Sequence, residues 1–244
     1  MVVSAESARV CARFELDGPA VEIPWREVTA DQLSGAAPFR TFRWRDGQRH
    51  YSGTYWSSTN SGHVIYESRL ELSNLLLADF DPTVTQIVAQ PFLLAATVDG
   101  QQRRHIPDFL YFTPRGPIVV DVKPAARLLR PKVTFTFDWT RQLVEMAGWE
   151  YRTLSEPDSA VLENVRFLSG YRRGWLLSSA LVNELQAAAL EGETLGRACA
   201  TVPGWAPQIV RAALFHLIWR QHLHVDLTKP LQPSTVMTRS ASHD

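Results

Sequence analysis

The most constraining feature of the sequence is a segment that is apolar except where it carries charge. Residues 117–123 read Pro-Ile-Val-Val-Asp-Val-Lys, a composition typical of a β-strand. Asp121 and Lys123 are two positions apart and therefore lie on the same face of that strand. The segment is either an edge strand with solvated charges or a strand that brings two charged groups to a site of chemistry.

A second carboxylate reaches the same face through a turn. The strand expected before residues 117–123 spans 105–112 and contains Asp108, and Thr-Pro-Arg-Gly at 113–116 provides the turn. A two-residue turn at 114–115 sets Asp108 opposite Asp121, and one at 115–116 sets it opposite Lys123. Both registers bring the three charged groups together. A three-residue loop would break this parity unless a bulge restored it.

Carboxylates that converge in a buried place tend to protonate, and a divalent cation removes that problem. Hard oxygen ligands suit Mg²⁺ or Mn²⁺, and a nearby lysine can hold an attacking water or a phosphate oxygen. The face therefore predicts a metal-dependent phosphodiesterase site. We expect its third carboxylate from a preceding helix, where Glu67 and Glu71 lie four residues apart. By themselves these two residues are more typical of a solvated helix face.

Length and charge bound the function. The 244 residues suffice for one large domain or two small ones, and 25 basic side chains cancel 25 acidic ones. A uniformly basic nucleic-acid coat is excluded, so any DNA binding must use local patches. Residues 123–141 have such a positive excess, with a solvated helix as the alternative. Residues 40–49 have another, and a solvated edge strand is the favoured interpretation there over a phosphate-contacting strand.

Several classes of protein are not indicated. No apolar run approaches the length that crosses a bilayer. The amino terminus lacks a basic region followed by an apolar stretch, which predicts no secretory signal. Cys11 and Cys199 lack the spacing of a disulfide scaffold or a cysteine zinc site. We expect a soluble cytoplasmic protein.

The hydrophobic pattern predicts an α/β unit followed by a mainly helical part. In the first part, Asp99-Gly100 is a hairpin signal. The helices and strands expected there are a helix at 64–78, strands at 84–88, 92–98, 105–112 and 117–123, a helix at 138–147 and a strand at 149–154. Beyond a boundary at 156–159 we expect helices at 176–190 and 207–221, a short strand at 223–226, and a frayed tail at 233–244.

Five ordered motifs resemble the TnsA family, the endonuclease subunit of heteromeric transposases. They are Ser-Arg-Leu-Glu at 68–71, Leu-Leu-Leu-Ala-Asp-Phe-Asp-Pro at 75–82, Gln-Pro-Phe at 90–92, Ile-Pro-Asp-Phe-Leu at 106–110 and Val-Asp-Val-Lys-Pro-Ala-Ala-Arg-Leu at 120–128. Ile-Pro-Trp at 23–25 also resembles the family's lead-in. The resemblance implies a PD-(D/E)xK, restriction-endonuclease-like fold, which is a mixed sheet flanked by helices. It also implies that the protein uses Mg²⁺ or Mn²⁺ to nick DNA at transposon ends.

The resemblance implies a role for each matching residue. Glu71 matches the family's helix glutamate, Asp108 its central metal ligand and Lys123 its catalytic lysine. The family varies at Asp121, where some members have Gln, and this chain has the residue that is more usual in nucleases. Val122 would lend its backbone carbonyl to the metal. The implied set is thus Glu71, Asp108 and Asp121 as catalytic metal ligands with Lys123 beside them.

The resemblance also implies domains and partners. Residues 1–155 would form the endonuclease domain, with 1–60 as its lead-in, and 156–232 a smaller helical, winged-helix-like domain before the tail at 233–244. Family members cleave the 5′ strand, while a DDE transposase (TnsB-like) cuts and joins the 3′ strand. The carboxy-terminal domain would contact an AAA+ regulator (TnsC-like) or DNA. No membrane partner is expected.

Other residues have less specific interpretations. Glu67 matches no obligatory family position and is expected to be solvated or to support the site without binding metal. For His105 an exposed basic strand is favoured over a phosphate contact. His216, His222 and His224 fit no zinc template, so packed or surface roles are favoured.

Two other functions remain open from the sequence. One is a stand-alone restriction or repair nuclease of the same fold, which would nick specifically without a partner. The other is a non-catalytic DNA-binding adaptor, which would bind no Mn²⁺.

Overall fold

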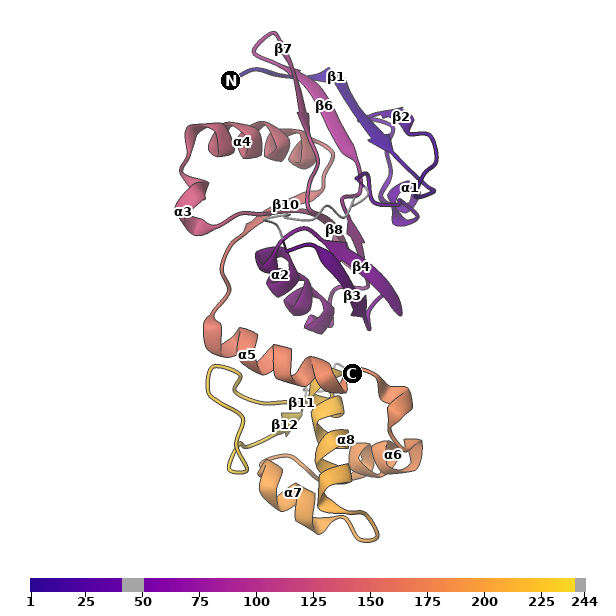
Figure 1. Cartoon of the computed structure of the whole chain (residues 1–244), viewed down its shortest axis with the longest axis vertical. Helices are drawn as coiled ribbons and strands as arrows, with labels where there is room; N and C mark the ends of the chain where they lie inside the picture. The colour runs from indigo at the N-terminus through magenta and orange to yellow at the C-terminus, as the bar shows by residue number, and fades with distance from the viewer. Residues whose placement is uncertain (41–50, 240–244) are drawn as a thin grey trace. The chain divides into compact units, whose positions relative to one another are not determined.

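The computed structural model describes residues 1–40 and 51–239, and its chain divides into two compact units (Figure 1). Unit 1 contains Met1–Asp79 and Thr83–Glu156, and unit 2 contains Phe80–Pro82 and Pro157–Asp244. The architecture is mixed α/β, which is compatible with a nuclease fold. Most of the Arg-rich patch at 40–49 and the last part of the tail lie outside the described residues.

Unit 1 contains an antiparallel sheet with the strand order β2-β1-β6-β7. Its strands are β1 (Val3–Ala12), β2 (Val21–Pro24), β6 (Leu93–Val98) and β7 (Gln101–His105). Strand β1 is not predicted from the hydrophobic pattern. The reason is that only its second half alternates clearly, with Ala8, Val10 and Ala12 buried, and that the register with β6 shifts between Ser4 and Arg9.

The hairpin predicted at Asp99-Gly100 is confirmed. Both residues have positive φ, 48° and 75°, as the turns that join β6 to β7 require. The continuous strand predicted at 105–112 is wrong, because β7 ends at His105 and a separate strand, β8, begins at Phe109. Pro107 lies in this break and has no N–H for a strand ladder. The chain thereby passes from the first sheet to the second, and Asp108 is the residue directly before the first strand of the second sheet that follows.

The second sheet of unit 1 has the order β10-β9-β8-β5. Its strands are β5 (Gln86–Ala89), β8 (Phe109–Thr113), β9 (Gly116–Val122) and β10 (Glu150–Leu154). Thr113 pairs with Gly116, so the turn lies at 114–115 and the strand register sets Asp108 opposite Asp121. Strand β10 runs parallel to β9 and places Thr153 beside Asp121. Of the two registers predicted for this turn, the structure has the first.

The helix predicted to begin at residue 64 begins later. Residues Gly62–Tyr66 form strand β4, which pairs with β3 (Gly53–Ser57), and helix α2 spans Arg69–Phe80. Val64 and Tyr66 are buried on one side of the hairpin, so a period of two prevails there. Ser68 and Glu71 then start the helix, because the Glu71 N–H donates to Ser68 Oγ at 3.1 Å and Ser68 Oγ donates to Glu71 Oε1 at 2.9 Å.

A buried carboxylate fastens this hairpin to the end of α2. Asp79 is 5% exposed and accepts hydrogen bonds from the Tyr55 hydroxyl at 2.7 Å and the Ser57 hydroxyl at 2.6 Å. It also accepts from the backbone N–H groups of Ser58 at 3.0 Å and Thr59 at 2.7 Å. Four different donors satisfy the charge, so the Asp79 of the Leu-rich motif is a structural residue.

Helix α4 (Pro131–Met146) shares a core with both sheets of unit 1. Trp25 ties the lead-in to it, since its indole N–H donates to the carbonyl of Leu143 at 2.8 Å. The same ring packs against Trp149 and Phe92, with centroid distances of 5.2 and 5.9 Å. The Ile-Pro-Trp motif therefore anchors β2 in the core.

Unit 2 is mainly helical. Its elements are α5 (Ser159–Leu168), α6 (Ser179–Ala187), α7 (Leu195–Thr201), α8 (Pro207–Trp219), short 3₁₀ turns at Ser169–Tyr171 and Gly174–Leu176, and the two-residue strands β11 (Leu223–His224) and β12 (Thr238–Arg239). Helix α8 lies in its core, and the buried His216 has its Nδ1 2.7 Å from the Tyr171 carbonyl. The winged-helix arrangement stays a prediction. In the described residues, every helix is too short or too polar to span a membrane.

Candidate active site

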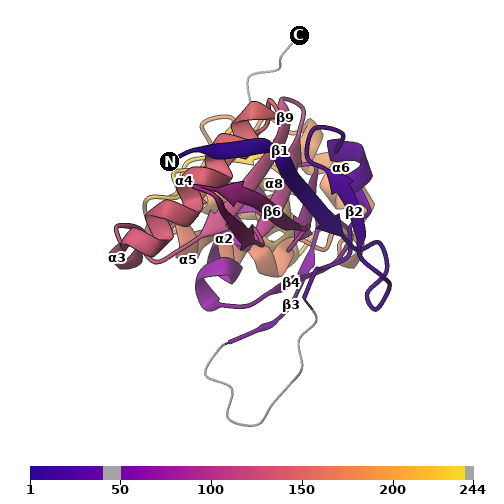
Figure 2. The same cartoon turned by 90° about the horizontal axis from the view of Figure 1, so that it is seen from above.

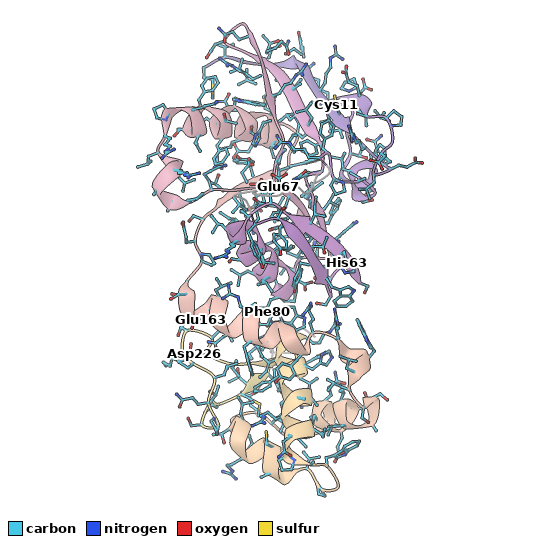
Figure 3. All side chains as sticks on the ribbon, in the orientation of Figure 1. Cys11, His63, Glu67, Phe80, Glu163 and Asp226 are labelled. Atoms are coloured by element: carbon cyan, nitrogen blue, oxygen red, sulfur yellow. The ribbon has the colours of Figure 1, made fainter. Side chains whose placement is uncertain are left out.

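The residues predicted to form the site surround one cavity of unit 1. Its volume is about 620 Å³, and it lies where α2, β9 and the segment between β7 and β8 meet. Glu67, at the start of α2, marks its place in Figure 3. Its polar or charged lining residues are Arg40, Ser52, Glu67, Ser68, Glu71, His105, Asp108, Asp121, Lys123 and Arg127. Val122 lines it as well. Four carboxylates thus share a cavity with Lys123, and the three predicted as metal ligands, Glu71, Asp108 and Asp121, come from three separate segments.

Asp121 is the most deeply buried carboxylate of the cavity, with 1% of its surface exposed. His105 Nε2 lies 2.8 Å from each of its oxygens, and the Tyr151 hydroxyl donates to Oδ2 at 2.5 Å. The interpretation of His105 as part of an exposed basic strand is wrong, because its side chain is 16% exposed and faces Asp121. Sequence spacing gave no signal for this pair, since it joins strands of different sheets.

Asp108 is the carboxylate of the site whose pKa is raised furthest above its ordinary value. Its Oδ2 accepts a hydrogen bond from the Val122 N–H at 2.6 Å, which links the start of β8 to the end of β9. Burial raises the pKa of Asp108 well above its ordinary value, and the negative charges of Asp121 and Glu71 raise it further. The Val122 N–H and Lys123 lower it only in part. Burial and the two neighbouring carboxylates thus oppose ionisation of Asp108 more than the Val122 N–H and Lys123 favour it.

Glu71 reaches the cavity from the first turn of α2. Its carboxylate accepts hydrogen bonds from the backbone N–H of Glu67 at 2.7 Å and from the hydroxyl of Ser68. Burial raises its pKa, the two hydrogen bonds lower it, and Lys123 lowers it a little more. The Ser-x-x-Glu motif thus starts the helix and also fixes the direction of the Glu71 side chain.

Lys123 lines the same cavity as the carboxylates. Its backbone N–H donates to the Leu154 carbonyl at 2.8 Å, which continues the parallel pairing of β9 and β10 past the last strand residue. Among the described residues no carboxylate lies within 4.0 Å of its ammonium group, although its charge acts on Asp108 and Glu71. The ammonium group is thus near the carboxylates without being neutralised by one of them.

The donor set suits a hard divalent cation. The oxygens available are those of Glu71, Asp108, Asp121 and the Val122 carbonyl, and the raised pKa of Asp108 reports negative charge that a cation would relieve. Within residues 1–40 and 51–239, no three His, Cys, Asp or Glu side chains already form a group able to hold a metal. The carboxylates accept hydrogen bonds from protein groups instead. Their oxygens are the ligand type that the metal prefers, but they are not arranged around one metal position.

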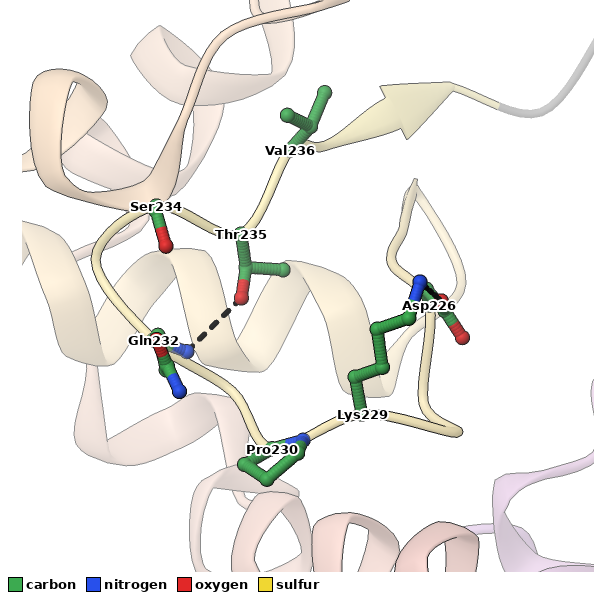
Figure 4. Close-up of a pocket in the computed structure, with 7 residues that line it drawn as sticks. All are labelled: Asp226, Lys229, Pro230, Gln232, Ser234, Thr235 and Val236. Carbon is green, nitrogen blue, oxygen red and sulfur yellow. Dashed lines mark hydrogen bonds and ion pairs between the residues drawn. The ribbon is translucent and has the colours of Figure 1, made fainter.

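A second hollow lies in unit 2 and has a different character (Figure 4). Its two charged lining residues, Asp226 and Lys229, pair with each other at 2.9 Å. The hydroxyl of Thr235 accepts from the Gln232 N–H at 2.9 Å. The two charges of this hollow pair with each other, and it brings together no group of carboxylates like that of unit 1, so we do not treat it as a competing catalytic site.

Part of unit 1 is similar to a known protein family. Residues 81–156 match the family described as the TnsA-like endonuclease N-terminal domain. The chain carries a TnsA-like domain. The matched segment of this TnsA-like domain contains Asp108, Asp121 and Lys123, whereas Glu71 precedes it. The inclusion of Glu71 therefore depends on its place at the cavity. A comparison with curated proteins found no match.

Proposed function

We propose that this protein is the endonuclease subunit of a Tn7-type heteromeric transposase and hydrolyses one strand, the 5′ strand, at transposon ends. The observation that carries the proposal is that Glu71, Asp108 and Asp121 come from three segments to share a cavity with Lys123, and that the last three of these four residues in sequence order lie in the stretch that matches a TnsA-like domain. Burying three carboxylates is costly for a domain that has no use for them, whereas a metal-dependent phosphodiesterase needs them.

In this proposal each residue has one task. Glu71, Asp108, Asp121 and the Val122 carbonyl hold Mg²⁺ or Mn²⁺, which supplies an activated water and charge for the phosphate. Lys123 orients that water or stabilises the negative charge that develops on the phosphate, for which a compact ammonium is suited. His105 and Tyr151 orient the carboxylate of Asp121 through their hydrogen bonds to it.

The partners follow from the family and from what the chain lacks. The sequence has no strong base-reading motif, so we propose that a DDE transposase (TnsB-like) selects the transposon ends and cuts the other strand. An AAA+ regulator (TnsC-like) would contact unit 2. These assignments extend the TnsA-like match of residues 81–156 to the whole chain.

Nicking of a supercoiled plasmid that carries the transposon ends tests the proposal. With the transposase partner and Mn²⁺, the parent should convert supercoiled plasmid to nicked circles, and Asp108→Ala should not. Asp138→Ala is the matched control, because it removes an exposed carboxylate of the same unit on helix α4. The proposal fails if the parent leaves the plasmid intact or if Asp108→Ala nicks as fast as the parent.

The same assay separates the other two functions. Sequence-specific nicking by the chain alone would indicate a stand-alone restriction or repair nuclease. The finding that favours a non-catalytic DNA-binding adaptor is that no three metal-ligating side chains of the described residues already form a group. Titration calorimetry decides that case, since an adaptor would bind no Mn²⁺ and the nuclease should bind it through Asp108.

A further inference from the structure

An exposed corner projects from unit 1 between helix α3 (Ala125–Leu128) and helix α4. In Figures 1 and 2, α3 lies at the outer edge of the unit. We propose that this corner, residues 125–132, is a DNA-contacting element in which Leu129 inserts into the duplex while Arg127, Arg130 and Lys132 hold the flanking phosphates. This inference rests on the proposed nuclease function and adds to it the element that grips the substrate.

Leu129 is unusually exposed for a leucine. Its exposed fraction is 91%, against 61% for Leu16, another exposed leucine of unit 1. Its neighbour Leu128 is partly buried and packs against the core of unit 1. The corner thus has an inward and an outward leucine in succession. The outward one gains nothing from the fold, because its apolar surface stays in water.

Hydrogen bonds hold the corner in this shape. The Thr134 hydroxyl donates to the Leu128 carbonyl at 3.0 Å, and the Val133 N–H donates to the Arg130 carbonyl at 2.8 Å. At the other end, the Ala125 N–H donates to Glu156 Oε2 at 2.9 Å. A leucine kept outside by a braced backbone loses little conformational freedom when it enters a partner.

All the charged residues within 125–132 are basic, and Glu156 is the carboxylate that bonds to the first residue of the corner. Arg127, Arg130 and Lys132 are exposed, and no carboxylate of the described residues lies within 4.0 Å of them. Arg130 is the N-cap of α4 and Lys132 lies in its first turn, where a helix dipole disfavours cations, whereas Arg127 lies in the last turn of the short α3. Stability of α4 therefore does not explain Arg130 and Lys132, whereas a polyanion would.

The corner is continuous with the candidate active site. Arg127 lines the same cavity as Lys123, only four residues away in the sequence. A strand whose phosphate lies among the carboxylates would therefore have its neighbouring phosphates near Arg127. Apolar side chains flanked by cations are how proteins enter the minor groove and unstack a base step. This combination favours duplex DNA over an acidic protein, for which a leucine wedge has no comparable slot.

Binding and bending of a generic duplex test the inference without cleavage. The full chain is titrated, in Ca²⁺ and 50 mM salt, into a 30-base-pair duplex whose two ends carry a fluorescent energy-transfer pair. Anisotropy gives the affinity, and repeating the titration at higher salt concentrations gives its salt dependence. Energy transfer reports bending of the duplex. The variants are Leu129→Ala and the triple change of Arg127, Arg130 and Lys132 to Ala. Leu16→Ala and Arg104→Ala are the controls, an exposed leucine and an exposed arginine elsewhere in unit 1.

The two variants should fail in different ways. The triple variant should lower the slope of log affinity against log salt by about 3 and weaken binding on the order of a hundredfold, because three phosphate contacts are lost. Leu129→Ala should keep the slope, lose the rise in energy transfer and weaken binding by about tenfold. The controls should behave as the parent.

Several results would overturn the inference. They are a parent that does not bind the duplex, a triple variant with the parental slope, and Leu129→Ala with the parental energy transfer. Because the assay needs no hydrolysis, it is separable from the nuclease proposal. A parent that never nicks but loses its salt slope with the triple variant would refute the proposed activity and support the corner as a DNA contact.

Discussion

Asp108→Asn should make the metal-free protein more stable while it abolishes nicking. The carboxylate of Asp108 stands where burial and the charges of Asp121 and Glu71 raise its pKa well above the ordinary value. Asparagine removes that charge and can still accept the hydrogen bond that the Val122 N–H donates at 2.6 Å. Its amide can also donate to a neighbouring carboxylate. Active sites commonly sacrifice stability for function in this way.

The expected gain in the free energy of unfolding is the difference between the repulsions removed by the substitution and the attractions lost with it. Two unit charges about 8 Å apart interact by about 2 kcal/mol at an effective dielectric constant of about 20. The substitution removes the repulsion from Asp121 and Glu71 and loses the attraction to Lys123, and each of the three interactions is assigned this magnitude of about 2 kcal/mol. Replacing a charged hydrogen bond by a neutral one costs about 1 kcal/mol. The net gain is about 1 kcal/mol, which raises Tm by about 2–4 °C for a unit of this size.

Scanning calorimetry with and without Mn²⁺ measures the effect. In EDTA, Asp108→Asn should unfold at a higher temperature than the parent, and Asp138→Asn should match the parent because its carboxylate is exposed on α4. Mn²⁺ at about a hundred times its Kd should stabilise the parent by about 2.7 kcal/mol and stabilise Asp108→Asn far less. The reasoning is refuted if Asp108→Asn melts below the parent in EDTA, or if Mn²⁺ stabilises both proteins equally.

Three further changes have distinct expected results. Lys123→Ala should reduce nicking by about a hundredfold or more and leave Mn²⁺ affinity nearly unchanged, as plasmid nicking and titration calorimetry would show. Asp79→Ala should destabilise unit 1 by about 3 kcal/mol in urea unfolding, because the Tyr55 hydroxyl and other buried donors lose their acceptor. His216 has a pKa lowered mainly by burial. The parent's urea midpoint should therefore fall as pH drops below about 6.5, and His216→Gln should flatten that dependence.

The sequence predicted the centre of the site because its residues are close in the chain. Asp108, Asp121 and Lys123 are joined by one two-residue turn, so strand alternation alone brings them together. Glu71 was less certain from its spacing, because a helix can dock in many ways. The family motif identified it, and the structure places it at the same cavity.

The elements that the sequence missed depend on distant contacts. Strand β1 is recognisable only once β2 and β6 pair with its two edges. The start of α2 was placed too early because Val64 and Ile65 fit a helical pattern as well as a strand, and the β3 partner decides between them. Local periodicity cannot choose when both periods fit the same apolar residues.

His105 shows why such contacts matter for chemistry as well as for the fold. It ends β7 in the first sheet, whereas Asp121 lies on β9 and Tyr151 on β10 in the second. The break at Pro107 lets one chain segment serve both sheets, so His105, which ends β7, faces the carboxylate near the end of β9. A histidine that follows two arginines looks solvated in sequence, yet this crossing makes it a hydrogen-bond partner of the most buried carboxylate in the cavity. The place where the chain passes from the first sheet to the second therefore also orients Asp121, through the hydrogen bond from His105.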